Sequence, residues 1–470
     1  MKNKKALKKI VFIVIASRDA EFFINIADVL DSTKYKVIFY TFYSPAVLQI
    51  REAGYEVFNF HSNNFNIEFK AGKVNSIALE EKYKIESLRG FFLHERFTFN
   101  SHNESYLLSK CWLYLDLLDT WLKAFKPDVV IQELGGFIAP MSFYYACRKN
   151  NIKHIFLEPM MFQGTIGFVE DAINYNIKVK SKLRNNHVDD YVNHYITSQN
   201  AVIPKKDEHH FRDATFVKFF NFSNFRKLCL KIWYKYFMGL DQEYDAIANH
   251  VWRNFKMLIN RKKLSSFYWP VKNLPRGIRY VYFPLHVPLD FQLTVRSKEW
   301  LNQIALLEQI SNFLPYGVEL WIKEHPAAIG AYSIDELQRL LESSNVKIIS
   351  PNENSFSIIH SAAAVITINS KVGAEALMQG KPLFVLGEAF YRNQGITFDI
   401  SSISELEKKL TDFLKNNSNF YPNRKKIRNF LNAVWEKSLP GELYVNTSEN
   451  INKFATSLIK ALELGQSLKK

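Results

Sequence analysis

The residues best suited to chemistry follow predicted strands in the second half of the chain. The apolar run at residues 318–322 leads directly into Lys323-Glu324-His325-Pro326, which places a cation, an anion and a titratable ring before a proline. A strand with this ending usually delivers polar groups to a ligand at its carboxyl end. Lysine adds a point charge and histidine a hydrogen bond, so Lys323, His325 and Pro326 are predicted to contact a phosphate or a ribose. Glu324 is interpreted as a solvated partner of Lys323.

A second cluster follows the predicted strand at residues 279–283. Two prolines stiffen the loop that carries His286 and Asp290, so both side chains should be held in place. A fixed carboxylate facing a cleft suits acid, base or nucleophilic chemistry at a sugar carbon. The alternative is that Asp290 only caps the next helix. Arg296 follows shortly after and is a candidate for binding the same ligand.

Two later strand ends carry small and polar residues. In the first, Asn369 and Ser370 precede a helix start with Gly373 close by, and free N–H groups at such a start attract anions. Glu375 is placed to accept hydrogen bonds from ribose hydroxyls. The alternative is an ordinary capping serine followed by an early-turn glutamate. In the second, Tyr391 could stack on a ligand or belong to a packed loop.

Strands alternate with helices in both halves of the chain, which is typical of parallel sheets with helical crossovers. The sequence therefore predicts an α/β protein: two doubly wound, Rossmann-like domains face a central cleft, with a helical insertion between them. All four polar clusters lie at strand ends of the second domain, where such sheets bind ligands. The predicted units are 1–167 (first Rossmann-like domain), 168–275 (insertion and connection), 276–446 (second Rossmann-like domain) and 447–470 (a carboxyl-terminal helix that packs back on the first domain).

The insertion is basic and aromatic and shows no strand–helix alternation. Residues 211–240 mix Phe, Trp and Tyr with Lys and Arg, which suits a helix lying in a membrane interface. A helical subdomain with inward-packed aromatics is the alternative.

Composition narrows the class of partner. The 61 Lys and Arg against 46 Asp and Glu give a net charge of +15, which favours anionic partners such as nucleotides, polyanionic glycans or the inner leaflet of a membrane. No nucleic-acid-reading motif is present. The glycine-rich signatures of dinucleotide and P-loop proteins do not occur, and no D-x-D pair suggests a metal-bridged diphosphate. Neither a metal nor a cofactor is predicted.

Cysteine use and hydropathy favour a cytoplasmic protein. Cys111, Cys147 and Cys229 are far apart and without metal-like spacing, and all three are interpreted as ordinary core residues in a reducing compartment. The apolar run at residues 11–16 is too short for a secretory or spanning segment. We therefore expect a cytoplasmic protein on the inner face of the membrane.

With these residues in view, the chain resembles the bacterial capsule polysaccharide biosynthesis family, whose characterised members are Kdo transferases of GT-B fold that use CMP-Kdo. The resemblance covers about a quarter of the chain and rests on four motifs in order: FPLHVPLD, KEHP, SKVGAEAL followed by GKP, and GEAFYRNQGIT. The amino-terminal half matches only in its general α/β character.

The resemblance implies an α/β, GT-B-like fold with the acceptor in residues 1–167 and the nucleotide sugar in residues 276–446. It also implies roles for single residues. Asp290 corresponds to the family's essential acidic residue, which is implicated in chemistry at the anomeric carbon. His325 matches the histidine of the His-Pro motif, Ser370 the serine of the phosphate-binding turn, and Glu375 the acidic residue beyond it. The family often has Gln where His286 stands.

The family often has an acidic residue next to a glycine near the second-last strand of its first domain. This chain instead has Glu133-Leu-Gly-Gly and Glu158-Pro-Met-Met, and both glutamates end predicted strands. Each is a candidate general base, an acceptor contact or a buried structural carboxylate.

The predicted function is metal-independent transfer of a sugar, Kdo or a related acidic sugar, from a CMP-activated donor to a lipid-linked glycan or polysaccharide acceptor. A UDP-sugar or CDP-glycerol donor is the alternative among enzymes, because the fold does not fix the base or the sugar. The alternative of another class is a non-catalytic capsule-assembly protein that binds anionic glycan or membrane.

Overall fold

The computed structural model of this chain describes residues 7–63, 74–99, 101, 103–179, 186–199, 221–240, 247–270, 277–416 and 423–469. Two predictions fall partly outside these ranges. They are the domain boundary at residues 275 and 276, and residues 211–220 of the segment predicted to contact a membrane.

The amino-terminal sheet is doubly wound. Its strands run in the order β13-β6-β5-β4-β1-β2-β3, and the five from β3 to β5 are parallel. The chain thus starts in the middle of the sheet, winds outward to β3 and then crosses to β4 and β5, which is the Rossmann order. Both faces are covered, so β1 is buried from Ile10 to Val14 and is a continuous apolar run in the sequence. The strands are β1 (Lys8–Val14), β2 (Tyr35–Thr41), β3 (Glu56–Asn59), β4 (Val129–Glu133), β5 (Lys153–Pro159), β6 (Thr165–Glu170) and β13 (Leu439–Pro440).

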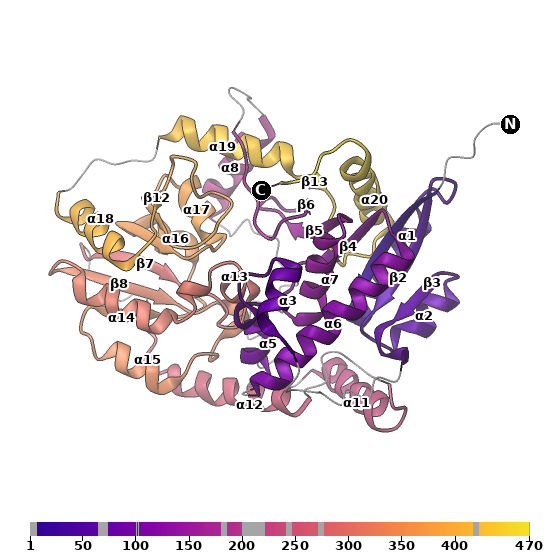
Figure 1. Cartoon of the computed structure of the whole chain (residues 1–470). Coiled ribbons are helices and arrows are strands. Elements are labelled where there is room, and N and C mark those ends of the chain that lie inside the picture. The colour runs from indigo at the N-terminus through magenta and orange to yellow at the C-terminus, as the bar shows by residue number, and fades with distance from the viewer. Residues whose placement is uncertain are drawn as a thin grey trace.

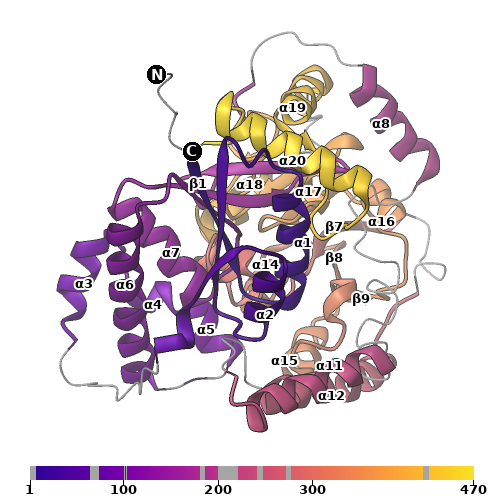
Figure 2. The same cartoon turned by 90° about the vertical axis from the view of Figure 1, so that its right-hand side faces the viewer.

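The last two strands of this sheet are antiparallel and join distant parts of the chain. β6 pairs with β5 through a connection that contains Gly164 at φ +76°, and it runs three residues past the predicted boundary at 167. β13 then brings the carboxyl-terminal segment back to β6. Helix α20 (Ser448–Glu463) lies against α1 (Ser17–Asp28), where the rings of Phe454 and Phe22 meet edge to face at 5.0 Å (Figure 2).

The second sheet repeats the same winding. Its six strands are all parallel and run in the order β12-β11-β10-β7-β8-β9, so β7 and β10 are neighbours whose following helices leave in opposite directions. The strands are β7 (Arg279–Pro284), β8 (Val318–Lys323), β9 (Val346–Ile349), β10 (Ala364–Thr367), β11 (Leu383–Val385) and β12 (Phe398–Asp399). Two Rossmann-like domains therefore stand side by side (Figure 1), which confirms the predicted fold class.

Helices cover both sheets. Those of the first domain include a 22-residue helix, α6, whose buried face packs on α7. The helices of the first domain are α2 (Ala46–Glu52), α3 (Ser76–Tyr83), α4 (Leu88–Phe91), α5 (Leu93–Thr98), α6 (Glu104–Phe125) and α7 (Ile138–Lys149). Those of the second are α13 (Phe291–Thr294), α14 (Gln303–Phe313), α15 (Ile334–Leu341), α16 (Ser355–Ser361), α17 (Val372–Met378), α18 (Ile403–Lys415) and α19 (Arg424–Lys437).

Three helices of the connecting segment are described, namely α8 (Asn186–Ser198), α11 (Phe222–Tyr236) and α12 (Ile247–Leu264). α8 packs on the second domain, where Tyr195 is buried and its hydroxyl accepts a hydrogen bond from Gln379 at 2.8 Å. α11 and α12 lie along one edge of the molecule in both views (Figures 1 and 2).

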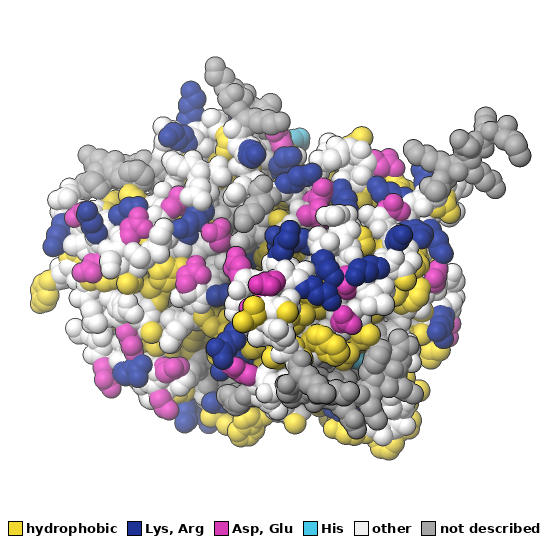
Figure 3. Space-filling model, in the orientation of Figure 1, with side chains coloured by type: hydrophobic (Ala, Val, Ile, Leu, Met, Phe, Trp, Pro, Cys, Tyr) yellow, Lys and Arg dark blue, Asp and Glu magenta, His cyan; other side chains and the backbone are white. Residues whose placement is uncertain are grey.

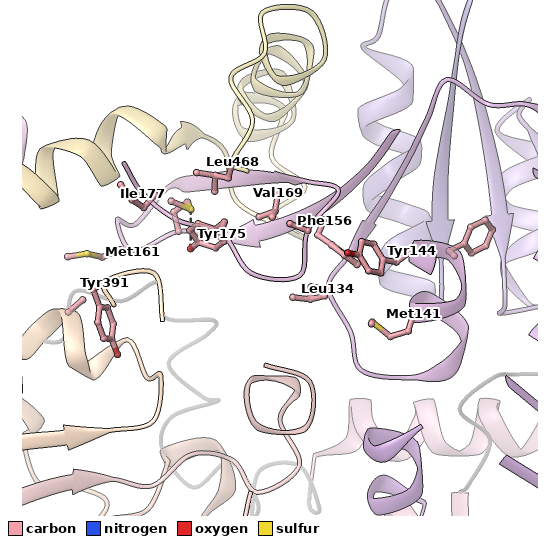
Figure 4. Packing of buried hydrophobic residues seen from close by; sticks show 14 of the residues in the cluster. Leu134, Met141, Tyr144, Phe156, Met161, Val169, Tyr175, Ile177, Tyr391 and Leu468 are labelled. Carbon is pink, nitrogen blue, oxygen red and sulfur yellow. Dashed lines mark hydrogen bonds between the residues drawn. The ribbon is translucent and has the colours of Figure 1, made fainter. Parts of the chain in front are cut away.

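One apolar cluster crosses the domain boundary. Met161, after β5, and Tyr391, in the second domain, are both buried in it, and Figure 4 shows them close together. The two domains are therefore packed against each other in this structure.

The cysteine prediction is correct for two residues of the three. Cys111 and Cys147 are buried in the core, whereas Cys229 is exposed on α11. The reason is that α11 buries none of its residues, so its apolar side chains do not enter a core.

Candidate functional site

The candidate site lies where the second sheet changes direction. The loops that follow β7 and β10 leave the sheet there. A long hydrogen bond of 3.4 Å, from the Asn369 amide to Nε2 of His286, joins them. Open α/β sheets bind their ligands at such a switch point. Two buried polar atoms in this crevice, Nδ1 of His286 and Oδ1 of Asn369, have no hydrogen-bond partner among the described residues. Buried polar atoms usually have a partner, which can be protein or ordered water, so both atoms can form a hydrogen bond with a bound molecule.

Asp290 caps a helix and also faces charged groups. Its carboxylate accepts a hydrogen bond of 3.1 Å from the Gln292 amide at the start of α13, as the capping alternative predicts. Burial raises the pKa of the Asp290 carboxyl above its ordinary value, and the nearby Arg296 guanidinium opposes that shift. Capping occupies one carboxylate oxygen, so it does not exclude a second role for the other.

The strand end Lys323-Glu324-His325 directs its first two side chains to opposite faces of the sheet, as strand geometry requires. Lys323 is buried and donates hydrogen bonds to the Glu353 carbonyl (2.5 Å) and the Ser355 hydroxyl (2.8 Å). Burial lowers the pKa of Lys323 to about 8.

The interpretation of Glu324 as a solvated partner of Lys323 is wrong. Its carboxylate is buried and accepts hydrogen bonds from the Tyr268 hydroxyl (2.6 Å) and the Gly330 amide (2.9 Å). Glu324 therefore fixes the loop beyond the strand.

The two histidines of the site are neutral near pH 7. Burial is the main cause that lowers the pKa values of His286 and His325 to about 4, and each also lies near another basic group. Nδ1 of His325 accepts a hydrogen bond of 3.1 Å from the Ala327 amide, so its ring proton sits on Nε2. His325 can thus donate one hydrogen bond from Nε2 to a ligand.

Tyr391 holds the turn after β10 in place. Ser370 accepts a hydrogen bond at Oγ from the Val372 amide (3.2 Å), and its carbonyl accepts one from the Tyr391 hydroxyl (2.6 Å). A Cβ at position 373 would lie 2.3 Å from that hydroxyl, so Gly373 makes room for Tyr391. Tyr391 is fully buried and supports the turn in this structure, as the packed-loop alternative predicts.

Glu375 lies buried beneath the same turn, close enough to Lys323 for their charges to interact. Burial raises the pKa of Glu375 to about 7, and Lys323 partly offsets this. A carboxyl that titrates near neutral pH beside a buried lysine is a frequent feature of functional sites.

This shift predicts a pH-dependent stability. The folded protein holds the Glu375 proton more tightly than the unfolded chain, so this residue's contribution to stability falls as the pH rises from about 4.5 to about 7. Glu375→Gln should match the wild type near pH 4 and exceed its unfolding temperature at pH 8. Thermal unfolding across this range tests the prediction, with exposed Glu336→Gln as the control. Equal curves for wild type and Glu375→Gln would contradict it.

Arg296 and Glu158 are paired with each other across the domain boundary. The guanidinium donates two hydrogen bonds to the Glu158 carboxylate (3.2 and 3.1 Å), and a third to the Ile173 carbonyl (2.9 Å). Both side chains are buried, 7% and 8% exposed. Arg296, predicted to bind the nucleotide, is therefore occupied by the first domain in this arrangement.

Further contacts close the same boundary. Nζ of Lys371 donates a hydrogen bond to the Pro159 carbonyl (2.9 Å), and His94 Nδ1 lies 2.8 Å from the Thr294 hydroxyl. Residues that include Glu158, Arg296 and Asn369 line a cavity of only about 40 Å³. Small-molecule sites typically offer about 300 Å³ or more, so this cavity is too small for a ligand of that size in the present arrangement of the domains.

Glu133 lies elsewhere, at the switch point of the first sheet. Its carboxylate is 3.2 Å from the Arg18 guanidinium and accepts a hydrogen bond from the Tyr444 hydroxyl. Asp19 lies next to this group and is buried, and burial raises its pKa to about 6. The structure thus brings together the candidates of the second domain and Glu158, but not Glu133.

Sequence reasoning missed His94. It lies on α5, in a part of the chain for which no strand or helix was predicted, and its partner Thr294 is 200 residues away. The glycine pair after β4 indicated that another side chain comes close there. A Cβ at Gly136 would lie 2.5 Å from the His94 ring.

The described residues contain neither a metal-binding cluster nor a membrane-spanning helix. No group of three or more His, Cys, Asp or Glu side chains is arranged to hold a metal ion. Among the described helices, none combines the length and the apolar character that crossing a bilayer requires.

The two switch points and the interdomain boundary define a GT-B-like protein of two Rossmann-like domains. Residues 233–417 match the family model described as capsule polysaccharide biosynthesis protein. All four motifs quoted above lie within this match, which confirms the predicted family resemblance.

Two kinds of curated relatives align with parts of the chain. Protein FixF of Sinorhizobium fredii is 29% identical over 159 residues, which cover 33% of this chain and 37% of that protein. Capsule polysaccharide modification protein LipA of Neisseria meningitidis is 28% identical over 81 residues, covering 17% and 12%. The chain therefore spans well under half the length of the relatives that it matches.

Solved structures with a similar outline include a glycosyltransferase from Rickettsia africae (12% identity, 98% of this chain and 100% of that chain, TM-score 0.32). Another is KpsC of Thermosulfurimonas dismutans, described as a beta Kdo 2,7 transferase (14% identity, 74% and 89%, TM-score 0.34). The two doubly wound sheets define the fold of this chain.

Proposed function

We propose that this chain is a glycosyltransferase of capsule polysaccharide biosynthesis that moves a sugar from a CMP-activated donor to a growing surface glycan. The observation that supports the proposal is that Asp290, His325 and Ser370, from three family motifs, follow the carboxyl ends of the adjacent strands β7, β8 and β10. We further propose Kdo or a related acidic sugar as the group transferred, and a lipid-linked glycan as the acceptor.

The phosphate side of the donor needs positive charge and N–H dipoles, because CMP leaves as a phosphate monoester. His325, after β8, can donate from Nε2, and the Ser370 hydroxyl follows β10, which is separated from β8 by β7 in the sheet. Lys323 is buried behind them with a pKa of about 8, so it is mostly protonated at pH 7 and adds a positive field. None of these steps requires a metal, in keeping with the metal-independent reaction that we propose.

The sugar side of the donor needs a carboxylate near the anomeric carbon. We assign that role to Asp290, because carboxylates stabilise oxocarbenium-like centres in glycoside chemistry. Glu158 stands across the boundary and becomes available as a base or acceptor contact when Arg296 releases it. Glu133 lies at the other switch point, which suits an acceptor contact rather than donor chemistry.

Donor binding is the first test. CMP should raise the unfolding temperature of the purified protein more than UMP, UDP or AMP, because a ligand stabilises only the state that binds it. His325→Ala should reduce the CMP shift. A shift with UDP alone would favour the UDP-sugar alternative. No shift with any nucleotide would favour the non-catalytic capsule-assembly protein.

We also propose a peripheral position on the inner face of the cytoplasmic membrane. The net charge of +15 supports it, since the inner leaflet is anionic.

A further inference from the structure

Helix α11 presents an apolar face to solvent. None of its residues is buried, and Phe222, Trp233 and Tyr236 are 80%, 51% and 68% exposed. An ordinary surface helix turns its apolar stripe toward the core and its polar residues outward. α11 therefore carries its aromatic residues on the side that a soluble helix keeps polar.

The spacing of these residues places them on one stripe. Positions 222, 225, 229, 233 and 236 follow the three- and four-residue steps of one helix face. Lys227, Lys231 and Tyr234 instead line a hollow of about 320 Å³ that reaches residues 15–17 after β1. The side of the helix that carries Lys227, Lys231 and Tyr234 therefore faces the first domain, and the aromatic stripe faces away from it.

Helix α12 also exposes aromatic residues, and it is anchored to the second domain. The Asn260 side chain is buried and donates hydrogen bonds to the Gly330 (3.0 Å) and Tyr332 (3.1 Å) carbonyls of the second domain. On the other side of the helix, Trp252 is 65% exposed and Phe255 is 41% exposed. The anchor fixes the direction in which these aromatic residues point.

Charge identifies the kind of partner. Neither helix contains an Asp or a Glu. Hydrophobic side chains gather along the lower edge of the molecule in Figure 3, where Figure 1 places both helices. The exposed basic residues outside the hollow are Arg226, Lys256, Lys262 and Lys263, whereas Arg253 and Arg261 interact with His94 and Glu324.

We propose that the exposed faces of α11 and α12 form a docking surface for an anionic lipid bilayer. Aromatic rings interleaved with lysine and arginine suit the headgroup region, where the rings enter and the cations meet lipid phosphates. A second copy of the chain fits poorly, because a symmetric contact would bring the same cations against each other.

This docking surface would supply the membrane contact that the proposed function requires. The hollow under α11 opens at the carboxyl end of β1, where the proposed acceptor domain has its switch point. A bilayer on the outer side of α11 therefore lies next to the strand ends that would receive a lipid-linked acceptor. This last step rests on the proposed function, whereas the docking itself does not.

Vesicle flotation with the full chain tests the docking. Wild type should float with phosphatidylglycerol vesicles and not with phosphatidylcholine vesicles, and high salt should release it. Lys256→Gln/Lys262→Gln/Lys263→Gln should weaken the partition about 100-fold. Phe225→Ser/Trp233→Ser/Tyr236→Ser should weaken it about 10-fold or more.

The matched control is Tyr316→Ser, which removes a fully exposed aromatic residue outside both helices and should leave flotation unchanged. Unfolding temperatures check that each variant folds. Flotation of both triple variants equal to wild type would overturn the proposal, as would a dimer that the aromatic variant converts to monomer. Flotation without any nucleotide effect would retain the docking and remove the transferase.

Discussion

Asp290→Asn should lower the rate of sugar transfer by about 100- to 1,000-fold, the usual loss when one group that stabilises charge in the transition state is removed. The substitution keeps the oxygen that caps α13, since asparagine is an equally good cap, so the fold should be retained. It removes only the negative charge that we assign to the anomeric centre. The measurement is CMP release from CMP-Kdo in the presence of acceptor.

Two controls separate chemistry from structure. CMP should stabilise Asp290→Asn as it stabilises wild type, because the phosphate site is intact. Asp335→Asn, at the exposed start of α15 in the same domain, should transfer at the wild-type rate. Full transfer by Asp290→Asn would remove Asp290 from the mechanism and leave it as a helix cap.

Arg296→Met should destabilise the protein by about 3–5 kcal/mol, the cost of leaving one member of a buried ion pair without its partner. The substitution leaves the Glu158 carboxylate buried and loses the hydrogen bond to the Ile173 carbonyl. Chemical denaturation at pH 7 measures the effect.

The comparison pair is Arg339 with Glu308, which is joined at 2.8 Å but has an arginine 63% exposed. Arg339→Met should change the stability far less, because exposed ion pairs contribute little. Adding Glu158→Gln to Arg296→Met should recover much of the loss, since the unpaired charge is then gone. A single Arg296 variant as stable as Arg339→Met would show that this pair does not hold the domains together.

The strands and their winding could be predicted because parallel strands covered on both faces are continuous apolar runs. β1, β8 and β10 are such runs, and the chain alternates them with helices. The antiparallel end of the first sheet could not be predicted. β13 has two residues, and its partner β6 is more than 260 residues earlier in the chain.

The sequence could place the candidate residues at one edge of the second sheet, because they follow strands of that sheet, but it could not predict their contacts. The pairing of Arg296 with Glu158 spans 138 residues, and no local pattern announces it. The same holds for Tyr391, whose position under Gly373 depends on how two loops pack.

The most direct test of the account is calorimetric titration of CMP onto wild type, His325→Ala, Ser370→Ala and the double variant. If both side chains hold one phosphate in a common crevice, each single variant should lose affinity, and the two losses should not add in the double variant. Wild-type affinity in both single variants would contradict the shared site, and with it the assignment of this edge of the sheet to the donor.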